Sequence, residues 1–453
     1  MALLMLVMLF TACKPNIIKK PNEDYEVNLD IDRNITETLR ILVPSNDGDL
    51  EAGYIEALIP GFKEMFPNVT IKLDRRTISD EKYAESVSAA IASGNVPDLF
   101  YTNTAFYYYL VAKNCVISLE PYYEASEKAG VFDMDADFYT SFFNMSVYEG
   151  ERYIVPRSMD SVVSYYNTEI LEAAGIDPKT DKRFNNSWTW DDLISVCQDV
   201  NDFITSPAGK AAGYGDCYAL QADFDWEAVF NALMLSYGVN AFDENGDVAI
   251  DCPEMYELAN MLRDLKKEGR ILKESTSGFR FTNGKCAFYF SSLGPSRMDL
   301  NASVKGKFDV LPFPLIMAKG TPYIGCGFAG WGISSTAEGV KRDLAWQFLN
   351  YMISREGQMA LINNGLATPS IRVELAEEKQ WSKGYSDLNL DAWLVGEEYK
   401  VSSKFFTKHD PSCSFDILTE LQAFWLNLTD STSKSVESCI KTCVEALEKA
   451  TAK

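Results

Sequence analysis

An alternation of short apolar runs and amphipathic segments near the start of the chain constrains the fold most. Residues 39–43, 69–73 and 98–101 are short runs of the kind that form buried strands. Apolar side chains recur at helical spacing between these runs, first over residues 55–66 and then over 83–91. A strand-helix-strand-helix-strand order predicts parallel strands joined by crossover helices, and therefore an α/β lobe.

The length of 453 residues is too great for one ordinary core and predicts two domains of about 150–200 residues each. Hydrophobic residues make up 47% and charged residues 24%, as in soluble globular proteins. The later chain is richer in helix. A capping-box pattern at Thr189 and Asp192 starts one helix, residues 253–269 form another, and residues 435–450 form a last amphipathic helix. We also expect a helix directly after Ser335 and a short strand over 247–250.

Charge and histidine content narrow the function. The 65 acidic and 42 basic residues leave a formal charge of −23, which disfavours nucleic acid and anionic membrane surfaces as partners. Such a chain suits a neutral, zwitterionic or cationic ligand. The one histidine, His409, removes most zinc sites and makes a Ser-His-Asp triad improbable. No G-x-S-x-G nucleophile motif is present, so we expect no enzymatic activity, no metal and no cofactor.

The first residues predict export. Met1 to Ala12 is almost entirely apolar but too short to span a bilayer, as in the central region of a signal peptide. The run ends in Phe10-Thr11-Ala12-Cys13, which resembles a bacterial lipobox, although Phe10 stands where Leu is usual. We therefore expect Cys13 to carry a lipid that holds the protein on the outer face of the cell membrane. An ordinary cleaved signal peptide is the alternative.

Five segments, in order along the chain, resemble the extracellular solute-binding proteins of bacterial ABC importers, in the branch that includes maltose-binding proteins. The segments are residues 94–100 (GNVPDLF), 150–156 (GERYIVP) followed by Tyr166-Asn167, 188–193 (WTWDDL), 281–288 (FTNGKCAF) and 343–349 (DLAWQFL). Each is weak alone, but their common order and spacing make the resemblance specific.

The resemblance implies a two-lobed α/β clamshell of the type II periplasmic-binding class. Its lobes would be joined by hinge strands near residues 156–167 and 324–327 and would close on a small ligand. It also implies membrane-embedded ABC permease subunits as partners and a monomeric receptor. The expected divisions are a signal peptide with the lipidated cysteine at 1–13, a flexible tether at 14–36, lobe I at 37–159 with 328–362, and lobe II at 160–327 with 363–453.

The candidate ligand-binding residues follow partly from the residues and partly from the resemblance. Loops at the carboxyl ends of parallel strands form the usual ligand edge, which selects the loop after the third strand. Sugars need aromatic platforms together with carboxylate and hydroxyl partners. The candidates are Asn103, Thr104, Asp160, Phe224, Asp225, Trp226, Ser292, Ser296, Trp331 and Trp425.

Several alternatives remain open. Trp226 and Trp425 fit core packing as well as sugar stacking, and Asp160 fits a solvated or capping role as well as a ligand contact. The family's charged sugar contacts are missing at Thr102, Ala105 and Phe106, so a maltodextrin ligand is doubtful. A carbohydrate is the expected ligand. A polyamine or another small solute on the same fold is the alternative, and a secreted carbohydrate-active enzyme is a weaker one.

Overall fold

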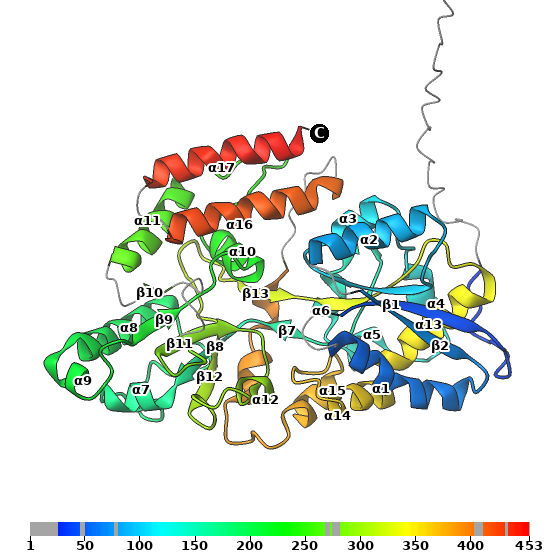
Figure 1. Ribbon diagram of the computed structural model, residues 1–453, viewed down its shortest axis with the longest axis horizontal. Helices are drawn as coiled ribbons and strands as arrows, with labels where there is room; N and C mark the ends of the chain where they lie inside the picture. The colour runs from blue at the N-terminus through cyan, green and yellow to red at the C-terminus, as the bar shows by residue number, and fades with distance from the viewer. Residues whose placement is uncertain are drawn as a thin grey trace, which may run out of the picture.

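The chain forms two α/β lobes that lie side by side along the long axis of the molecule (Figure 1). The computed structural model describes residues 26–45, 50–76, 80–267, 272–273, 281–402, 411–430 and 434–452. The lipobox with Cys13, and His409, lie outside the described residues. Each lobe contains a five-stranded sheet, and a three-stranded sheet lies between the lobes. The predicted two-lobed α/β class is confirmed.

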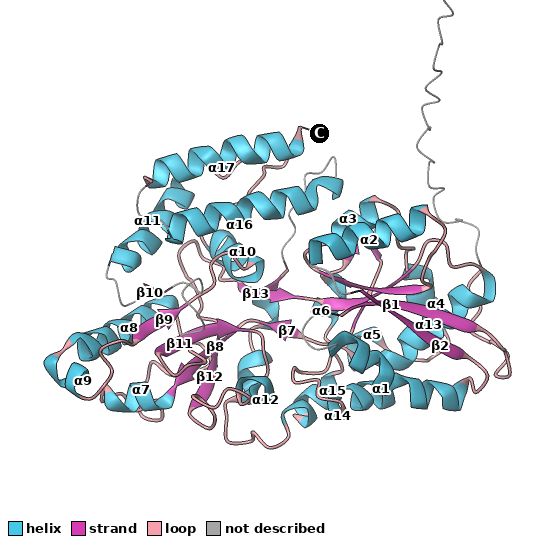
Figure 2. Ribbon diagram, in the orientation of Figure 1, coloured by secondary structure: helices cyan, strands magenta, loops and turns pink. Residues whose placement is uncertain are grey.

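Lobe I opens with the predicted strand-helix-strand-helix-strand unit. Its elements are β1 (Thr38–Pro44), α1 (Leu50–Met65), β2 (Thr70–Arg76), α2 (Asp80–Ala92), β3 (Leu99–Asn103), α3 (Tyr107–Ala112), α4 (Glu120–Lys128), α5 (Met134–Asp137), α6 (Thr140–Asn144), β4 (Val147–Tyr148), β5 (Glu151–Arg152), β6 (Val155–Pro156), β14 (Ala329–Ile333), α13 (Gly339–Ile353) and α14 (Arg355–Asn363). The sheet order is β2-β1-β3-β14-β6. Strand β1 runs parallel to β2 and β3, and β14 runs antiparallel to β3 and β6. Helices cover both faces, with α2 and α3 on one side and α1 and α14 on the other (Figure 2).

Local sequence explains the first helix pair. Ile55, Leu58 and Phe62 of α1 are buried against the sheet, as their spacing predicts. Pro60 lies inside α1 without ending it. The proline is exposed, so water can satisfy the backbone carbonyl that loses its helical partner. Gly94, with φ of +72°, turns the chain after α2 in the left-handed conformation that glycine adopts without strain.

Lobe II contains the second five-stranded sheet, in the order β10-β9-β11-β8-β12. Its elements are β8 (Val163–Asn167), α7 (Thr168–Ala173), α8 (Trp190–Thr205), α9 (Pro207–Ala211), β9 (Tyr218–Gln221), α10 (Glu227–Ser236), α11 (Pro253–Lys267), β10 (Leu272–Lys273), β11 (Cys286–Ser291), α12 (Pro295–Met298), β12 (Phe308–Pro312), η2 (Gln380–Ser382), η3 (Leu390–Trp393), η4 (Glu397–Tyr399), η5 (Pro411–Cys413), α16 (Ser414–Asp430) and α17 (Val436–Thr451). Helices α16 and α17 lie together at one side of this lobe (Figure 1).

Two predicted helix starts after the first lobe I unit have different outcomes. At α8 the Thr189 hydroxyl accepts a hydrogen bond from the Asp192 amide at 3.2 Å, and the Asp192 carboxylate accepts one from the Thr189 amide at 2.9 Å. The predicted capping box is confirmed. The helix expected directly after Ser335 instead begins at Gly339, because the Ser334 hydroxyl holds Thr336 in a turn (3.3 Å) before the helix starts.

The strand predicted over 247–250 is wrong. Only one bridge forms, between Phe242 and Val248. The turn between them is organised by the Asp243 carboxylate, which accepts hydrogen bonds from the Asn245 and Asp247 amides at 2.8 and 2.9 Å. Too few residues then remain opposite each other to build a ladder.

Two strands cross between the lobes where the family resemblance implied. The chain leaves the lobe I sheet at β6, forms β7 (Asp160–Ser161), and enters the lobe II sheet at β8. It returns through β13 (Ile324–Gly327), which leads into β14. Strand β13 pairs antiparallel with β7 and parallel with β15 (Lys400–Val401). These three strands form the hinge sheet, in the order β15-β13-β7.

The core of lobe I extends beyond the predicted boundaries. Val27 and Leu29 pack against it, and Gln347 donates a hydrogen bond to the Leu29 carbonyl at 2.9 Å. Residues 26–36 therefore belong to lobe I, and only 14–25 remain as a proposed tether. Leu366 and Ile371 also pack in this core, so the lobe continues past residue 362. The third passage between lobes follows at α15 (Val373–Glu377), which contacts α5 and η2.

Candidate ligand-binding cleft

Asp160 stands where the two lobes meet. It is half-buried at the start of β7, opposite Gly327 of β13. Ser292 of lobe II lies near enough to its carboxylate to lower the pKa of that group. A Cβ placed on Gly327 would lie 3.8 Å from the Asp160 carboxylate and 3.2 Å from the Thr104 hydroxyl of lobe I. Glycine at 327 thus lets groups from both lobes approach one another, and Asp160, Thr104 and Ser292 come together.

The carboxylate of Asp160 is partly desolvated. Burial raises its pKa above the ordinary value, and the nearby Ser292 hydroxyl and the Arg157 charge oppose that rise. A ligand hydroxyl donating to this carboxylate would restore hydrogen bonding lost on burial.

A buried ion pair lies beside Asp160. Arg157, between β6 and β7, contacts Glu51 of α1 through Nη2 at 2.7 Å and Nε at 3.1 Å. The two side chains are only 13% and 11% exposed. Burial alone would lower the pKa of Arg157, but the Glu51 carboxylate outweighs it and raises that pKa. The guanidinium also lies 5.0 Å from the Tyr54 ring centroid. Sequence reasoning missed this pair, because no local signal joins residues 106 positions apart.

The loop after β3 is held by its own polar groups. The Thr104 hydroxyl accepts a hydrogen bond from the Phe328 amide at 2.9 Å, and Asn103 Oδ1 accepts one from the Ala105 amide at 3.0 Å. Thr104 is 7% exposed. Both candidates therefore position the loop at the carboxyl end of β3, and Thr104 also faces the hinge.

The three candidates after β9 differ in exposure. Phe224 is 2% exposed and belongs to the lobe II core. Asp225 and Trp226 are half-buried. Trp226 is the residue immediately before α10, and its ring only packs partly against the core. Trp226 is thus the aromatic residue of this group that is not fully buried.

Two other aromatic candidates lie inside cores. Trp425 is fully buried and stacks on Phe230, with ring centroids 5.8 Å apart. Trp331 of β14 is 1% exposed and packs edge-on against Tyr101 at 5.8 Å. Neither ring presents surface to a ligand in this structure. The sequence around each tryptophan fits a core residue as well as a residue that stacks on a sugar. Only the packing in the structure distinguishes the two roles.

The turn before α12 brings lobe II onto lobe I. A Cβ on Gly294 would overlap the Ala367 carbonyl oxygen at 1.3 Å, so only glycine allows this approach. Ser296, the remaining candidate, is half-buried on α12 directly after this turn. Arg297 follows it and lies close enough to Tyr54 for its charge to oppose the burial-driven rise in the pKa of that phenol. The lobes are thus in contact beside the hinge.

Other site chemistry is limited in the part of the chain that the structure describes. No group of three or more His, Cys, Asp or Glu residues there is arranged to hold a metal. The nine cysteines described are free thiols, and all but Cys252 are buried. No described helix has the length and apolar character needed to cross a bilayer.

Comparisons with known proteins agree with this geometry. Residues 57–385 match the family described as bacterial extracellular solute-binding proteins. The arabinooligosaccharide-binding protein of Halalkalibacterium halodurans is 25% identical over 387 residues, covering 81% of this chain and 76% of that protein. The sn-glycerol-3-phosphate-binding periplasmic protein UgpB of Escherichia coli K12 is 24% identical over 221 residues, so the match spans only 48% of its length and 47% of this chain.

Solved structures share the architecture. The sugar-binding protein MalE from Xanthomonas citri superposes with a TM-score of 0.71 at 15% identity, covering 92% of this chain and 97% of that chain. UgpB from Mycobacterium tuberculosis, in complex with glycerophosphocholine, gives 0.70 at 18% identity, covering 90% and 97%. At these identities the likeness shows the fold alone. The family match covers most of the chain, and the chain belongs to the bacterial extracellular solute-binding proteins.

Proposed function

We propose that this protein is the solute receptor of an ABC importer and that it captures a carbohydrate between its lobes. The observation that carries the proposal is the meeting of Asp160 with the hydroxyls of Thr104 and Ser292 at the hinge. Carboxylate and hydroxyl groups that converge in this way match the hydroxyl rim of a sugar. Trp226, the half-buried residue directly before α10, would add an aromatic face for a sugar ring.

The charge balance of the cleft also favours a neutral ligand. Arg157 is neutralised by Glu51, and Asp160 feels both of these charges. A polyamine would need several carboxylates without partners at this point. The arabinooligosaccharide-binding relative, which matches this chain over most of its length, points to an oligosaccharide.

A phosphate ester of a polyol is a second candidate. Arg297 lies near Tyr54 at the lobe contact and forms no ion pair with a described residue. A guanidinium group without an ion-pair partner can form paired hydrogen bonds to a phosphate group. The Escherichia coli relative is named for sn-glycerol-3-phosphate binding, and the Mycobacterium tuberculosis UgpB structure, which shares this fold, is in complex with glycerophosphocholine.

The remaining parts of the proposal follow from this role. The protein acts by binding and release without turnover, as a monomer that presents its closed form to membrane-embedded permease subunits. Cys13 carries the lipid anchor, and residues 14–25 link it to lobe I.

A thermal-shift screen tests the ligand class directly. Arabino-oligosaccharides, malto-oligosaccharides, glycerol-3-phosphate and 1,4-diaminobutane are compared at equal concentration, because a ligand that binds only the folded state raises its Tm. We expect the largest rise with an oligosaccharide, together with a smaller radius of gyration by X-ray scattering. A rise with glycerol-3-phosphate alone would select the second candidate, and hydrolysis of an oligosaccharide would contradict the receptor role.

A further inference from the structure

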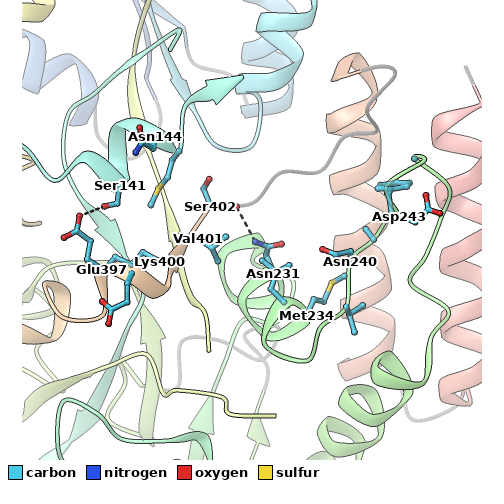
Figure 3. Close-up of a pocket in the computed structure, with 17 residues that line it drawn as sticks. Ser141, Asn144, Asn231, Met234, Asn240, Asp243, Glu397, Lys400, Val401 and Ser402 are labelled. Atoms are coloured by element: carbon cyan, nitrogen blue, oxygen red, sulfur yellow. Dashed lines mark hydrogen bonds between the residues drawn. The ribbon is translucent and has the colours of Figure 1, made fainter. Parts of the chain in front are cut away.

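A cavity of about 620 Å³ runs along the β15 edge of the hinge sheet (Figure 3). Its volume is in the range of small-molecule sites. The lining residues come from α6, from α10 and the loop after it, and from the chain around β15; they are Ser141, Asn144, Met145, Asn231, Met234, Leu235, Val239, Asn240, Ala241, Phe242, Asp243, Gly246, Glu397, Glu398, Lys400, Val401 and Ser402.

This cavity is distinct from the cleft at Asp160. Cys326 Sγ lies 3.5 Å from the sulfur of Met145, which lines the cavity. The next residue, Gly327, faces Asp160. Successive residues of a strand point to opposite faces of a sheet, so Met145 and Asp160 lie on opposite faces of the hinge sheet. Asp160, Thr104 and Ser292 do not line the cavity.

Both lobes build the cavity walls. Ser141 of α6, in lobe I, donates a hydrogen bond to Glu397 of η4 at 2.9 Å. On the other side, the Asn231 amide of α10 donates to the Ser402 carbonyl at 3.4 Å. A molecule in the cavity would therefore contact both lobes and would bind best in the arrangement in which these walls face each other.

Acidic side chains outnumber basic ones among the residues that line the cavity. Asn231 is only 7% exposed, and its side-chain oxygen accepts no hydrogen bond from any residue that the structure describes. Glu397, Glu398 and Asp243 contribute three carboxylates against one cation, Lys400. The Lys400 ammonium already donates to the Trp393 carbonyl at 2.7 Å. The cavity thus carries net negative charge, which favours a cationic ligand.

The acceptors lie at separate places along the cavity. Glu397 and Asp243 appear at opposite ends of the residues drawn, with Val401, Asn231 and Met234 between them (Figure 3). Carboxylates at two ends and apolar side chains between them match a molecule with an ammonium group at each end of an alkyl chain. We propose that this cavity is a second ligand site, which takes a linear aliphatic diamine.

Occupation of this site should be coupled to the movement of the lobes. A ligand shifts a conformational equilibrium toward the state to which it binds more tightly. Because the cavity and Asp160 lie on opposite faces of the hinge sheet, a rotation that brings the lobes together on one face separates them on the other. The diamine and the ligand bound at Asp160 should therefore change each other's affinity, and by linkage both change by the same factor.

Calorimetry with 1,4-diaminobutane tests the site on the mature protein. The double variant Glu397→Gln, Glu398→Gln keeps the size of both side chains and the acceptor for Ser141 but removes two charges. We expect saturable binding to the parent and at least a tenfold loss in the double variant. The control is Glu437→Gln, Glu445→Gln on α17, which removes equal charge at a distance from the cavity and should bind like the parent.

Two outcomes would overturn the proposal. An equal loss in the α17 control would mean general attraction of a cation to an acidic protein. Loss in Asp160→Ala, with full binding in the Glu397→Gln, Glu398→Gln variant, would place the amine in the cleft instead. The tests are separable, because carbohydrate binding depends on Asp160 and diamine binding on Glu397 and Glu398. Circular dichroism confirms that each variant is folded, and failure of one proposal leaves the other standing.

Discussion

The two sides of the hinge sheet differ in how their charged side chains are buried and paired. On the Asp160 side, Arg157 and Glu51 form a nearly inaccessible, bidentate ion pair, and the Asp160 carboxylate lies close to this pair and to Ser292. On the β15 side, Glu397 and Glu398 remain more accessible around a cavity, and the cation Lys400 is bonded to a backbone carbonyl. The buried pair of Arg157 and Glu51 holds its side chains in place, whereas the more accessible carboxylates on the β15 side can still accept hydrogen bonds from a ligand. The same short sheet thus has a buried ion pair beside Asp160 on one side and an open acidic cavity on the other.

The largest expected difference between the sides is in stability. Arg157→Ala leaves Glu51 buried without its partner, and breaking a buried pair in this way costs about 3–5 kcal/mol. Glu397→Gln on the other side keeps its hydrogen bond from Ser141 and should change the free energy of unfolding by less than about 1 kcal/mol. Urea denaturation measures both. Equal losses of stability in the two variants would contradict this difference between the two sides of the hinge sheet.

Ligand affinity should show the next largest difference. Asp160→Ala removes a charged hydrogen-bond acceptor worth about 1.5–3 kcal/mol, a loss of roughly ten- to 150-fold in the affinity for the cleft ligand. Glu397→Gln, measured without any amine, should bind that ligand within about twofold of the parent. Calorimetry with the best oligosaccharide from the screen decides this. Similar losses in both variants would mean that the cleft extends across the hinge sheet.

Trp226 should have a smaller effect on the same affinity. Its ring is only half-buried, so Trp226→Ala should weaken carbohydrate binding by about 2 kcal/mol or less, up to roughly thirtyfold, and leave the fold intact. Trp425→Ala provides the contrast, because the loss of a fully buried ring should lower the Tm instead. If Trp425→Ala stays fully stable but loses the ligand, Trp425 reaches the cleft in another state of the protein.

The smallest expected effect is the pH response of Lys400. Burial lowers its pKa to about 8 from an ordinary value of 10.5. The folded state therefore binds this proton less tightly than the unfolded chain, so stability should rise with pH between about 8 and 10. We expect the parent to gain up to about 1 kcal/mol per pH unit relative to Lys400→Met, measured by urea denaturation at pH 7, 8 and 9. A difference that stays constant with pH would contradict this burial effect.

Much of the fold could be predicted because its signals are local. The spacing of Ile55, Leu58 and Phe62 identifies α1, and the Thr189 capping box marks the start of α8. Such patterns depend on residues within a turn or two of one another, so no tertiary information is needed. The order of family-like segments then placed the hinge at β7 and β13, where the structure has it.

The site could be predicted only in part. Asp160, Thr104 and Ser292 were selected from the sequence and do come together at the hinge. Their neighbours Glu51 and Arg157 were not selected, because two ordinary charged residues carry no sign of partnership across 106 positions. The cavity at β15 was missed for the same reason, since its walls come from three distant parts of the chain.

The sequence by itself determined the α/β class, the two lobes and the places where the chain passes between them. These follow from hydrophobic periodicity and from turn and capping residues, which act over short distances. Only the tertiary structure decided which tryptophans lie fully inside a core and which stays half-buried, which charges are paired, and that residues 26–36 pack on lobe I. Those properties depend on which segments become neighbours when the hinge sheet forms. The type of a side chain alone does not determine which distant residues it contacts.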